Sequence, residues 1–312
     1  MRLATLFLLG VTLQCAPVYT ITSLGTFGGG INAAFAISQS GQAVGNAQTL
    51  NGTDVAFTST GNPTILQTQA NAQDINGMGA IAGTAYGSSG PRATIWENGI
   101  ARQVLEFDSY GLGINEGGDI AGSMVVASQA VAFVSSGDQL TAIETPGNWS
   151  AAYDISDNGQ AVGYYQKPNG RFQAFSWTQD GGTVSLGTLG GRNSYAQAVN
   201  NHGQIVGSSA VRSGYLHAFL YDGIMQDLGT LGGAFSAAYD INDNREAVGL
   251  SVNSIGQDRA FIWKNGNMFD LNSLIDPESG WALESAYGIN RQGQIVGAGT
   301  YNGQSTAFRL DP

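Results

Sequence analysis

A motif of about ten residues, I-N-x-x-G-x-x-V-G with conservative replacements, occurs seven times in this chain of 312 residues. Its copies end at Gly45, Gly83, Gly122, Gly163, Gly207, Gly249 and Gly297. Successive copies are therefore separated by 38, 39, 41, 44, 42 and 48 residues. A nearly constant period of this length indicates that one structural unit is repeated along the chain. The fold must accommodate seven such units.

A second mark follows each copy at a distance of 10 or 11 residues, and it is an Ala-Phe pair or a variant of one. The pairs are Ala56-Phe57, Ala93-Thr94, Ala132-Phe133, Ala174-Phe175, Ala218-Phe219, Ala260-Phe261 and Ala307-Phe308. An aromatic residue often stands two positions later, as Trp177 and Trp263 do. A spacing of two places both rings on one face of a β-strand.

The sixth unit predicts the secondary structure of the others. In SAAYDINDNREAVGLS two apolar runs flank a short polar turn, which indicates a β-hairpin. We expect Asn242 to open this turn by bonding its own backbone, and in most copies a Gly three residues later supplies a positive φ. The sixth copy has Arg245 at that position, which should weaken its turn. DRAFIWK is the predicted third strand.

Four short strands in about 42 residues are typical of one blade of a β-propeller. A helical repeat would need a sustained period of 3.6 residues, which this sequence lacks. The predicted fold is therefore all-β, a seven-bladed β-propeller of four-stranded blades that forms one domain over residues 17–312. A β-solenoid is the main alternative.

The hexapeptide LGTLGG occurs at 186–191 and 228–233, and LGTFGG occurs at 24–29. Each copy begins 13 residues before the core Ile or Val of its repeat. A phosphate loop would need a Lys and a helix directly after the glycines, so we interpret the hexapeptide as the last strand of a blade and the turn into the next. The seventh repeat ends one strand short, and Tyr19–Phe27 can supply that strand. We therefore predict that the N-terminal strand joins the last blade and closes the ring.

Composition and the N-terminus bear on location and partners. Arg2 precedes the apolar run Leu3–Leu13, which is too short to cross a bilayer, so residues 1–16 are predicted to be a signal peptide. A secreted, cell-surface or periplasmic location follows. Cys15 is the only cysteine, and Gln14 before it disfavours lipidation. A net charge of −11 with 12 scattered Lys and Arg residues argues against nucleic acid as a partner.

The segment LHAFLYDG at 216–223, together with LGTLGG and INxxGQIVG, resembles the bacterial extracellular repeats named for their His-Ala-Phe (HAF) motif. The resemblance covers about residues 20–310. It implies export and a repeat fold, but no reaction that can be carried over to particular residues. The complete tripeptide stands only at His217-Ala218-Phe219, so the His is not a required ligand or base.

Candidates for catalysis or metal binding are weak. Asp74, Asp154 and Asp240 precede the core Ile of their repeats, but the other copies have Ala or Gly there, so we interpret these acids as turn caps. His202 and His217 lack a nucleophile elbow or a metal signature. We expect no catalytic residue, no metal site and no cofactor.

The variable loops and the blade-joining segments should lie at one end of the propeller, where function usually resides. That end is predicted to carry aromatic residues suited to sugar faces or protein partners. The candidate ligand-binding residues are Trp149, Trp281, Tyr164, Tyr165, Tyr215 and Tyr301. The leading hypothesis is a monomeric, non-enzymatic module that binds a polysaccharide or a protein. The alternative is a polysaccharide-active lyase or glycoside hydrolase on the same scaffold.

Overall fold

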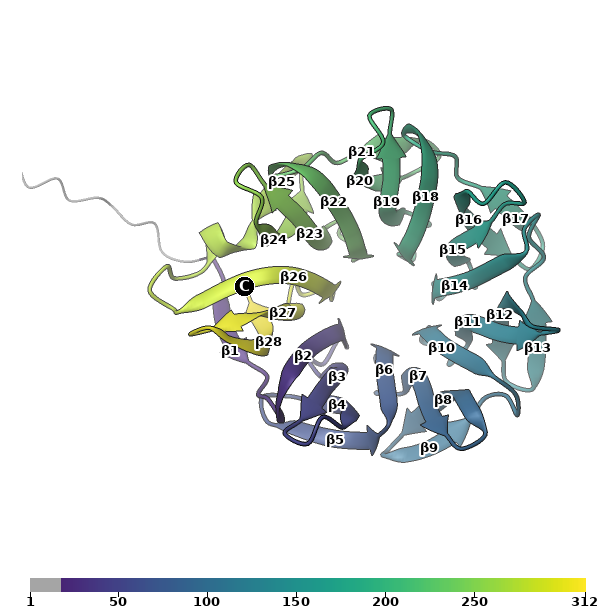
Figure 1. Cartoon of the computed structure of the whole chain (residues 1–312), viewed down its shortest axis with the longest axis horizontal. Helices are drawn as coiled ribbons and strands as arrows, with labels where there is room; N and C mark the ends of the chain where they lie inside the picture. The colour runs from purple at the N-terminus through teal and green to yellow at the C-terminus, as the bar shows by residue number, and fades with distance from the viewer. Residues whose placement is uncertain (1–17) are drawn as a thin grey trace, which may run out of the picture.

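The computed structural model describes residues 18–312, which form seven four-stranded antiparallel sheets around a central axis (Figure 1). The predicted seven-bladed β-propeller is confirmed. The predicted signal peptide and Cys15 lie outside the described residues. No helix within residues 18–312 is long and apolar enough to cross a membrane.

Each blade runs from an innermost first strand to an outermost fourth strand. Blade 1 comprises β2 (Gly28–Ile37), β3 (Ala43–Thr49), β4 (Asp54–Ser59) and β5 (Pro63–Thr68). Blade 2 comprises β6 (Ala70–Ile75), β7 (Ile81–Gly87), β8 (Gly90–Glu97) and β9 (Ile100–Gln103). Blade 3 comprises β10 (Ser109–Ile114), β11 (Ile120–Val126), β12 (Gln129–Ser136) and β13 (Gln139–Ala142). Blade 4 comprises β14 (Trp149–Ile155), β15 (Ala161–Gln166), β16 (Phe172–Thr178) and β17 (Gly182–Ser185).

The remaining blades continue the same order around the ring. Blade 5 comprises β18 (Gly190–Val199), β19 (Ile205–Val211), β20 (Leu216–Tyr221) and β21 (Met225–Asp227). Blade 6 comprises β22 (Gly232–Ile241), β23 (Ala247–Asn253), β24 (Asp258–Lys264) and β25 (Asn267–Asp270), and the 3-10 helix η1 (Leu271–Leu274) follows it. Blade 7 comprises β26 (Trp281–Ile289), β27 (Ile295–Tyr301) and β28 (Gln304–Asp311), with β1 (Thr20–Ser23) as its fourth strand.

The ring is closed by its N-terminal strand, as predicted. β1 pairs antiparallel with β28, with Thr20 opposite Asp311 and Ser23 opposite Phe308. Leu24 is fully buried, and its N–H donates to the carbonyl oxygen of Ala307 at 2.9 Å. The outer edge of β28 is therefore covered by backbone pairing rather than left open.

The LGTLGG and LGTFGG hexapeptides are blade-joining segments, but the prediction that they include the last strand of a blade is wrong for all three copies, because β1, β17 and β21 each end one residue before the hexapeptide begins. β17 ends at Ser185, and β18 begins at Gly190. Leu186 is 6% exposed and anchors the segment in the core, while Gly187 and Gly190 have φ of 78° and 98°. A Cβ on Gly191 would lie 2.4 Å from the carbonyl oxygen of Ala210. The glycines therefore serve backbone geometry, not a phosphate.

The repeated Ala-Phe pairs form the core between blades. The aromatic members Phe57, Phe133, Phe175, Phe219, Phe261 and Phe308 are among the largest fully or nearly fully buried side chains. The final Gly of each repeat is required by close packing within the blade. A Cβ on Gly163, for example, would lie 2.0 Å from the carbonyl oxygen of Ala151 on the neighbouring strand.

The turn between the first and second strands is built as the sequence predicts. Asn242 Oδ1 accepts hydrogen bonds from the N–H groups of Asn244 and Glu246, each at 3.0 Å. Arg245 occupies the glycine position of this turn with a φ of 63°. A side chain in this left-handed region costs about 1 kcal/mol relative to glycine. An exposed Arg245–Asp222 contact of 3.8 Å offsets little of that cost.

Arg245→Gly is therefore expected to raise the free energy of unfolding by up to about 1 kcal/mol in urea unfolding. The matched control is Gly159→Ala, because Gly159 occupies the same turn position in blade 4 with a φ of 74° and open space around it. This control should lower stability by a similar amount. A destabilised Arg245→Gly variant would contradict the strain assigned to this turn.

Candidate functional site

The two ends of the propeller differ in construction. The turn end carries the hairpin turns that follow the first strand of each blade, which begin at Ser38, Asn76, Asn115, Ser156, Asn200, Asn242 and Asn290. The loop end carries the loops between second and third strands and the segments that join the blades.

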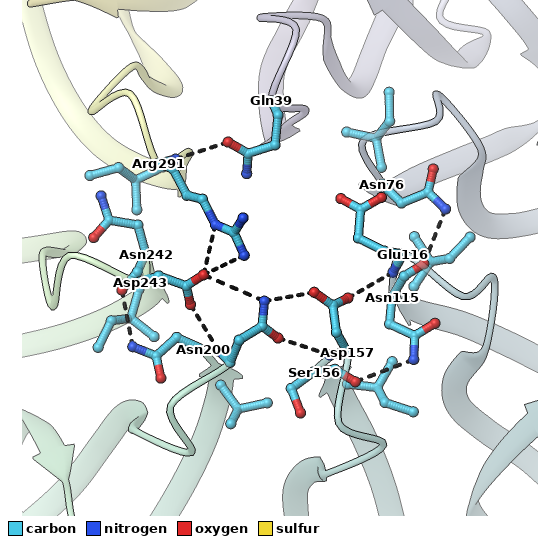
Figure 2. Close-up of a pocket in the computed structure, with 17 residues that line it drawn as sticks. Gln39, Asn76, Asn115, Glu116, Ser156, Asp157, Asn200, Asn242, Asp243 and Arg291 are labelled. Carbon is cyan, nitrogen blue, oxygen red and sulfur yellow. Dashed lines mark hydrogen bonds and ion pairs between the residues drawn. The ribbon is translucent and has the colours of Figure 1, made fainter.

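A cavity of about 140 Å³ opens on the axis at the turn end (Figure 2). Its inner wall is a ring of aliphatic side chains from the ends of the innermost strands, namely Ile75, Ile114, Ile155, Val199, Ile241 and Ile289. Its rim is polar and includes Gln39, Glu116, Asp157, Asn201, Asp243 and Arg291. The volume is below the range of about 300–1,000 Å³ that is usual for ligand pockets.

The polar rim connects neighbouring blades. Glu116 N–H donates to Asp157 Oδ1 at 2.9 Å, and Arg291 Nε donates to Asp243 Oδ2 at 2.7 Å (Figure 2). One layer deeper, Asn115 Nδ2 donates to the carbonyl oxygen of Ser156 at 3.2 Å. Five of the seven blade junctions have this side chain-to-carbonyl bond within the described residues. The acids of the rim therefore brace the ring rather than form a free catalytic pair.

Asp74, Asp154 and Asp240 also connect blades, so the interpretation of these acids as turn caps is wrong. Asp154 Oδ1 accepts from its neighbour Ile155 N–H at 2.7 Å, and Oδ2 accepts from Val199 N–H of blade 5 at 2.8 Å. Asp74 joins blades 2 and 3 in the same way, and Asp240 joins blades 6 and 7. Because each carboxylate serves two N–H groups, alternate blades can carry Ala or Gly at this position. The turns of these three blades are capped instead by the side chains of Asn76, Ser156 and Asn242.

The three aspartates are half-buried, and their carboxyl groups influence one another. The pKa of Asp154 is raised to about 8, chiefly by burial and then by the charge of Asp74, although hydrogen bonds from two backbone N–H groups lower it. Burial likewise raises the pKa of Asp240 to about 7 and that of Asp74 to about 6. The part of the chain that the structure describes holds no group of three or more His, Cys, Asp or Glu side chains arranged for a metal ion.

An aromatic cluster lies at the loop end of blades 4 and 5. We call it the Trp149 cluster, and it comprises Trp149, Tyr153, Tyr164, Phe172 and Tyr195. Tyr164 is central: its ring centroid lies 5.4 Å from that of Trp149 and 4.9 Å from that of Tyr195. Tyr164 also stacks on Tyr153 at 5.0 Å, with a hydrogen bond of 2.7 Å between the two hydroxyl groups. Four strands thus hold one continuous set of partly exposed rings.

The other predicted site residues are not part of this cluster. Trp281 and Tyr301 form a separate pair in blade 7, with ring centroids 5.1 Å apart. Tyr215 lies on the loop of blade 5 and is 58% exposed. Tyr165 was predicted to bind a ligand, but the structure contradicts this. Its side chain is only 3% exposed and packs on Phe175 in the core, where it cannot contact a ligand at the loop end.

Sequence reasoning missed Tyr153, Phe172 and Tyr195 as partners of Trp149. Phe172 begins the third strand, directly before the buried pair Gln173-Ala174. Tyr153 and Tyr195 lie on innermost strands. The position of Tyr153 is also aromatic in three other repeats, at Phe35, Tyr239 and Tyr287, so no sequence signal set it apart. His217 contacts a side chain of its own blade, with Nδ1 3.0 Å from Asp227 Oδ2.

A second cavity, of about 800 Å³, lies at the loop end between blades 1 and 2. Its lining includes Asp54, Gln69, Asn71 and Tyr86. At this junction Gln69 alone joins β5 to β6, whereas the longer LGTLGG segments join blade 4 to blade 5 and blade 5 to blade 6. Gln69 has a φ of 52°, and Asn71 Nδ2 donates to the hydroxyl oxygen of Tyr86 at 3.0 Å.

Comparison with known proteins supports the fold alone. No family model and no curated protein matches the sequence. Among solved structures, the β-propeller domain of the Trilobed protease from Pyrococcus furiosus is similar with a TM-score of 0.58, 11% identity and coverage of 77% of this chain and 81% of that one. TolB from Acinetobacter baumannii is similar with a TM-score of 0.51, 14% identity and coverage of 87% and 80%.

A puromycin-hydrolyzing peptidase from Mycobacterium tuberculosis is similar with a TM-score of 0.61 and 10% identity. The match covers 95% of this chain but 54% of the peptidase, so this chain spans about half of that protein's length. At these identities the neighbours establish the propeller architecture and nothing about ligands or chemistry.

Proposed function

We propose that this chain is a secreted, non-enzymatic module that binds a polysaccharide through the Trp149 cluster, and that it belongs to the HAF repeat family. The observation that carries the proposal is the convergence of five aromatic rings from β14, β15, β16 and β18 at the loop end. A propeller fold is consistent with a binding role. Family membership rests on the repeat motifs of the sequence.

The construction of the cluster suits a flat ligand with apolar and polar faces. Its rings are held on β-strands rather than on loops, so little conformational freedom is lost on binding. Burial raises the pKa of Tyr164, which keeps its hydroxyl group neutral and able to donate a hydrogen bond. Trp and Tyr rings offer an apolar face for the C–H groups of a sugar ring and a polar edge for its hydroxyl groups.

Trp149→Ala is expected to weaken polysaccharide binding at least tenfold, because it removes a central ring of the cluster. Binding can be screened on a glycan array and then measured by calorimetry with the polymers that bind. Trp281→Ala is the matched control, since it removes a paired aromatic residue at the same end in blade 7. Trp149→Phe should retain part of the affinity.

The same incubations test the enzymatic alternative. Mass spectrometry of the polymer after prolonged incubation should show no new product. Turnover that continues with time would favour a lyase or hydrolase over a binding module. Thermal melting should show that wild type and Trp149→Ala are both folded. Equal binding by these two folded proteins would remove the Trp149 cluster from the proposal.

A further inference from the structure

The positive charges of this acidic protein are unevenly distributed. Of the eleven Lys and Arg residues within residues 18–312, five form ion pairs with acidic side chains. The other six have no such partner in that part of the chain, and they are Arg102, Lys167, Arg171, Arg192, Arg212 and Lys264. Four of these six belong to the loop end of blades 4 and 5, which is where the Trp149 cluster lies.

Chain adjacency and local contacts place these four cations near the strands that carry the aromatic rings. Arg171 directly precedes Phe172, and Lys167 Nζ donates to Gln173 Oε1 at 2.6 Å on its other side. Arg192 precedes Asn193, whose Oδ1 accepts from Phe172 N–H at 3.1 Å. The side chain of Arg212 lies over Gly190, because a Cβ built there would meet Arg212 Cγ at 3.2 Å. Arg171, Arg192 and Arg212 are exposed.

Acidic side chains are scarce around them. The segments 164–172, 186–195 and 211–216 contain no Asp or Glu. Glu144 lies in the segment that enters blade 4, but it lines a cavity on the outer side with Trp177 and Thr183. Asp227 is occupied by His217. By contrast, the segments around blade 7 contain several acids, including Asp276, Glu278 and Glu284.

We infer that the polysaccharide bound at the Trp149 cluster is acidic, with carboxylate or sulfate groups that lie against Lys167, Arg171, Arg192 and Arg212. This inference rests on the proposed function and specifies its ligand class. Four cations beside a cluster of aromatic rings suit a polysaccharide whose sugar rings pack on the aromatic rings and whose spaced negative charges lie against the cations. Nucleic acid is a poorer match, because its duplex carries a charge about every 1.7 Å and the remainder of this protein would repel it.

The test compares polygalacturonate, chondroitin sulfate and neutral dextran as titrants of the full chain. Wild type should bind at least one acidic polymer about tenfold more tightly than dextran, and that affinity should fall as salt rises. The triple variant Arg171→Ala/Arg192→Ala/Arg212→Ala should lose about tenfold to a hundredfold of acidic-polymer affinity. The slope of the logarithm of its binding constant against the logarithm of salt concentration should fall in magnitude by up to about one for each cation removed.

The matched control is Arg102→Ala/Lys264→Ala, which removes unpaired cations elsewhere and should bind as wild type does. Dextran bound as tightly as the acidic polymers, with the triple variant unaffected, would overturn the acidic ligand while polysaccharide binding at Trp149 stands. Binding to none of the polymers, acidic or neutral, would overturn this inference and weaken the proposed function. Tighter binding to duplex DNA than to either acidic polymer would assign the surface to nucleic acid instead.

Discussion

A chain that lacks residues 18–24 is expected to lose its cooperative unfolding transition and to aggregate. These residues supply β1, and Tyr19 and Leu24 are buried at 4% and 0% exposure in the cores on either side of the closure. Their removal would also leave β28 as an open edge strand, which can pair with other copies. Urea unfolding and sedimentation measure both effects. Leu24→Ala alone should cost about 3 kcal/mol.

The control for this deletion follows from the strand register. Thr20 lies opposite Asp311, so the start of β1 is beside the end of β28. A permuted chain that begins at Gly25 and carries residues 18–24 after Pro312 through a short turn would form a simple hairpin there. It should recover most of the stability. A deletion variant that stays monomeric and unfolds at the wild-type urea concentration would show that closure contributes little.

The second large effect is a loss of stability as pH rises from about 5 to 8. Asp74, Asp240 and Asp154 have pKa values of about 6, 7 and 8 in the folded chain, all above the ordinary value of 3.8. The folded chain therefore holds more protons than the unfolded chain in this range, and stability must fall with pH. Their contribution is complete below about pH 4 and is lost above about pH 8. Each carboxyl contributes a slope of about 1.4 kcal/mol per pH unit while it is protonated only in the folded chain.

Asp154→Ala tests this directly, since Ala198 already occupies the same position in blade 5. The variant should be less stable than wild type at pH 5, because two buried N–H groups lose their acceptor. The difference should narrow as pH approaches 9, where wild type must bury a charge. Asp180→Ala, which removes an exposed acid, should leave the pH slope unchanged. An unaltered slope in Asp154→Ala would contradict the assignment.

The features that the sequence predicted correctly are periodic or local. Seven copies of one motif fix the blade count, and the missing strand of the last copy indicates the closure by β1. The turn at Asn242 and the positive φ of Arg245 depend on neighbouring residues alone. Such features can be deduced from one repeat at a time.

The features that were missed depend on how one blade sits against the next. The second oxygen of Asp154 bonds Val199, 45 residues away, and no local pattern indicates that contact. Tyr164 and Tyr165 are adjacent, yet only Tyr164 faces the aromatic cluster, because successive side chains of a strand point to opposite faces. The charge asymmetry likewise required the arrangement of three separate segments.

Each carboxylate bridge joins two blades, and the propeller has an odd number of blades, seven. The carboxylate bridges join blade 2 to blade 3 through Asp74, blade 4 to blade 5 through Asp154, and blade 6 to blade 7 through Asp240. Blade 1 therefore has no carboxylate bridge within the described residues. The Asn bonds of the turn end join blade 1 to blade 7 through Asn290 and Ser38, but within the described residues none joins it to blade 2. Within the described residues, bonds of these two kinds thus join every neighbouring pair of blades except blades 1 and 2. That junction is held instead by Asn46 Oδ1 of blade 1, which accepts from Ala72 N–H of blade 2 at 2.9 Å, and the cavity beside Tyr86 opens next to it.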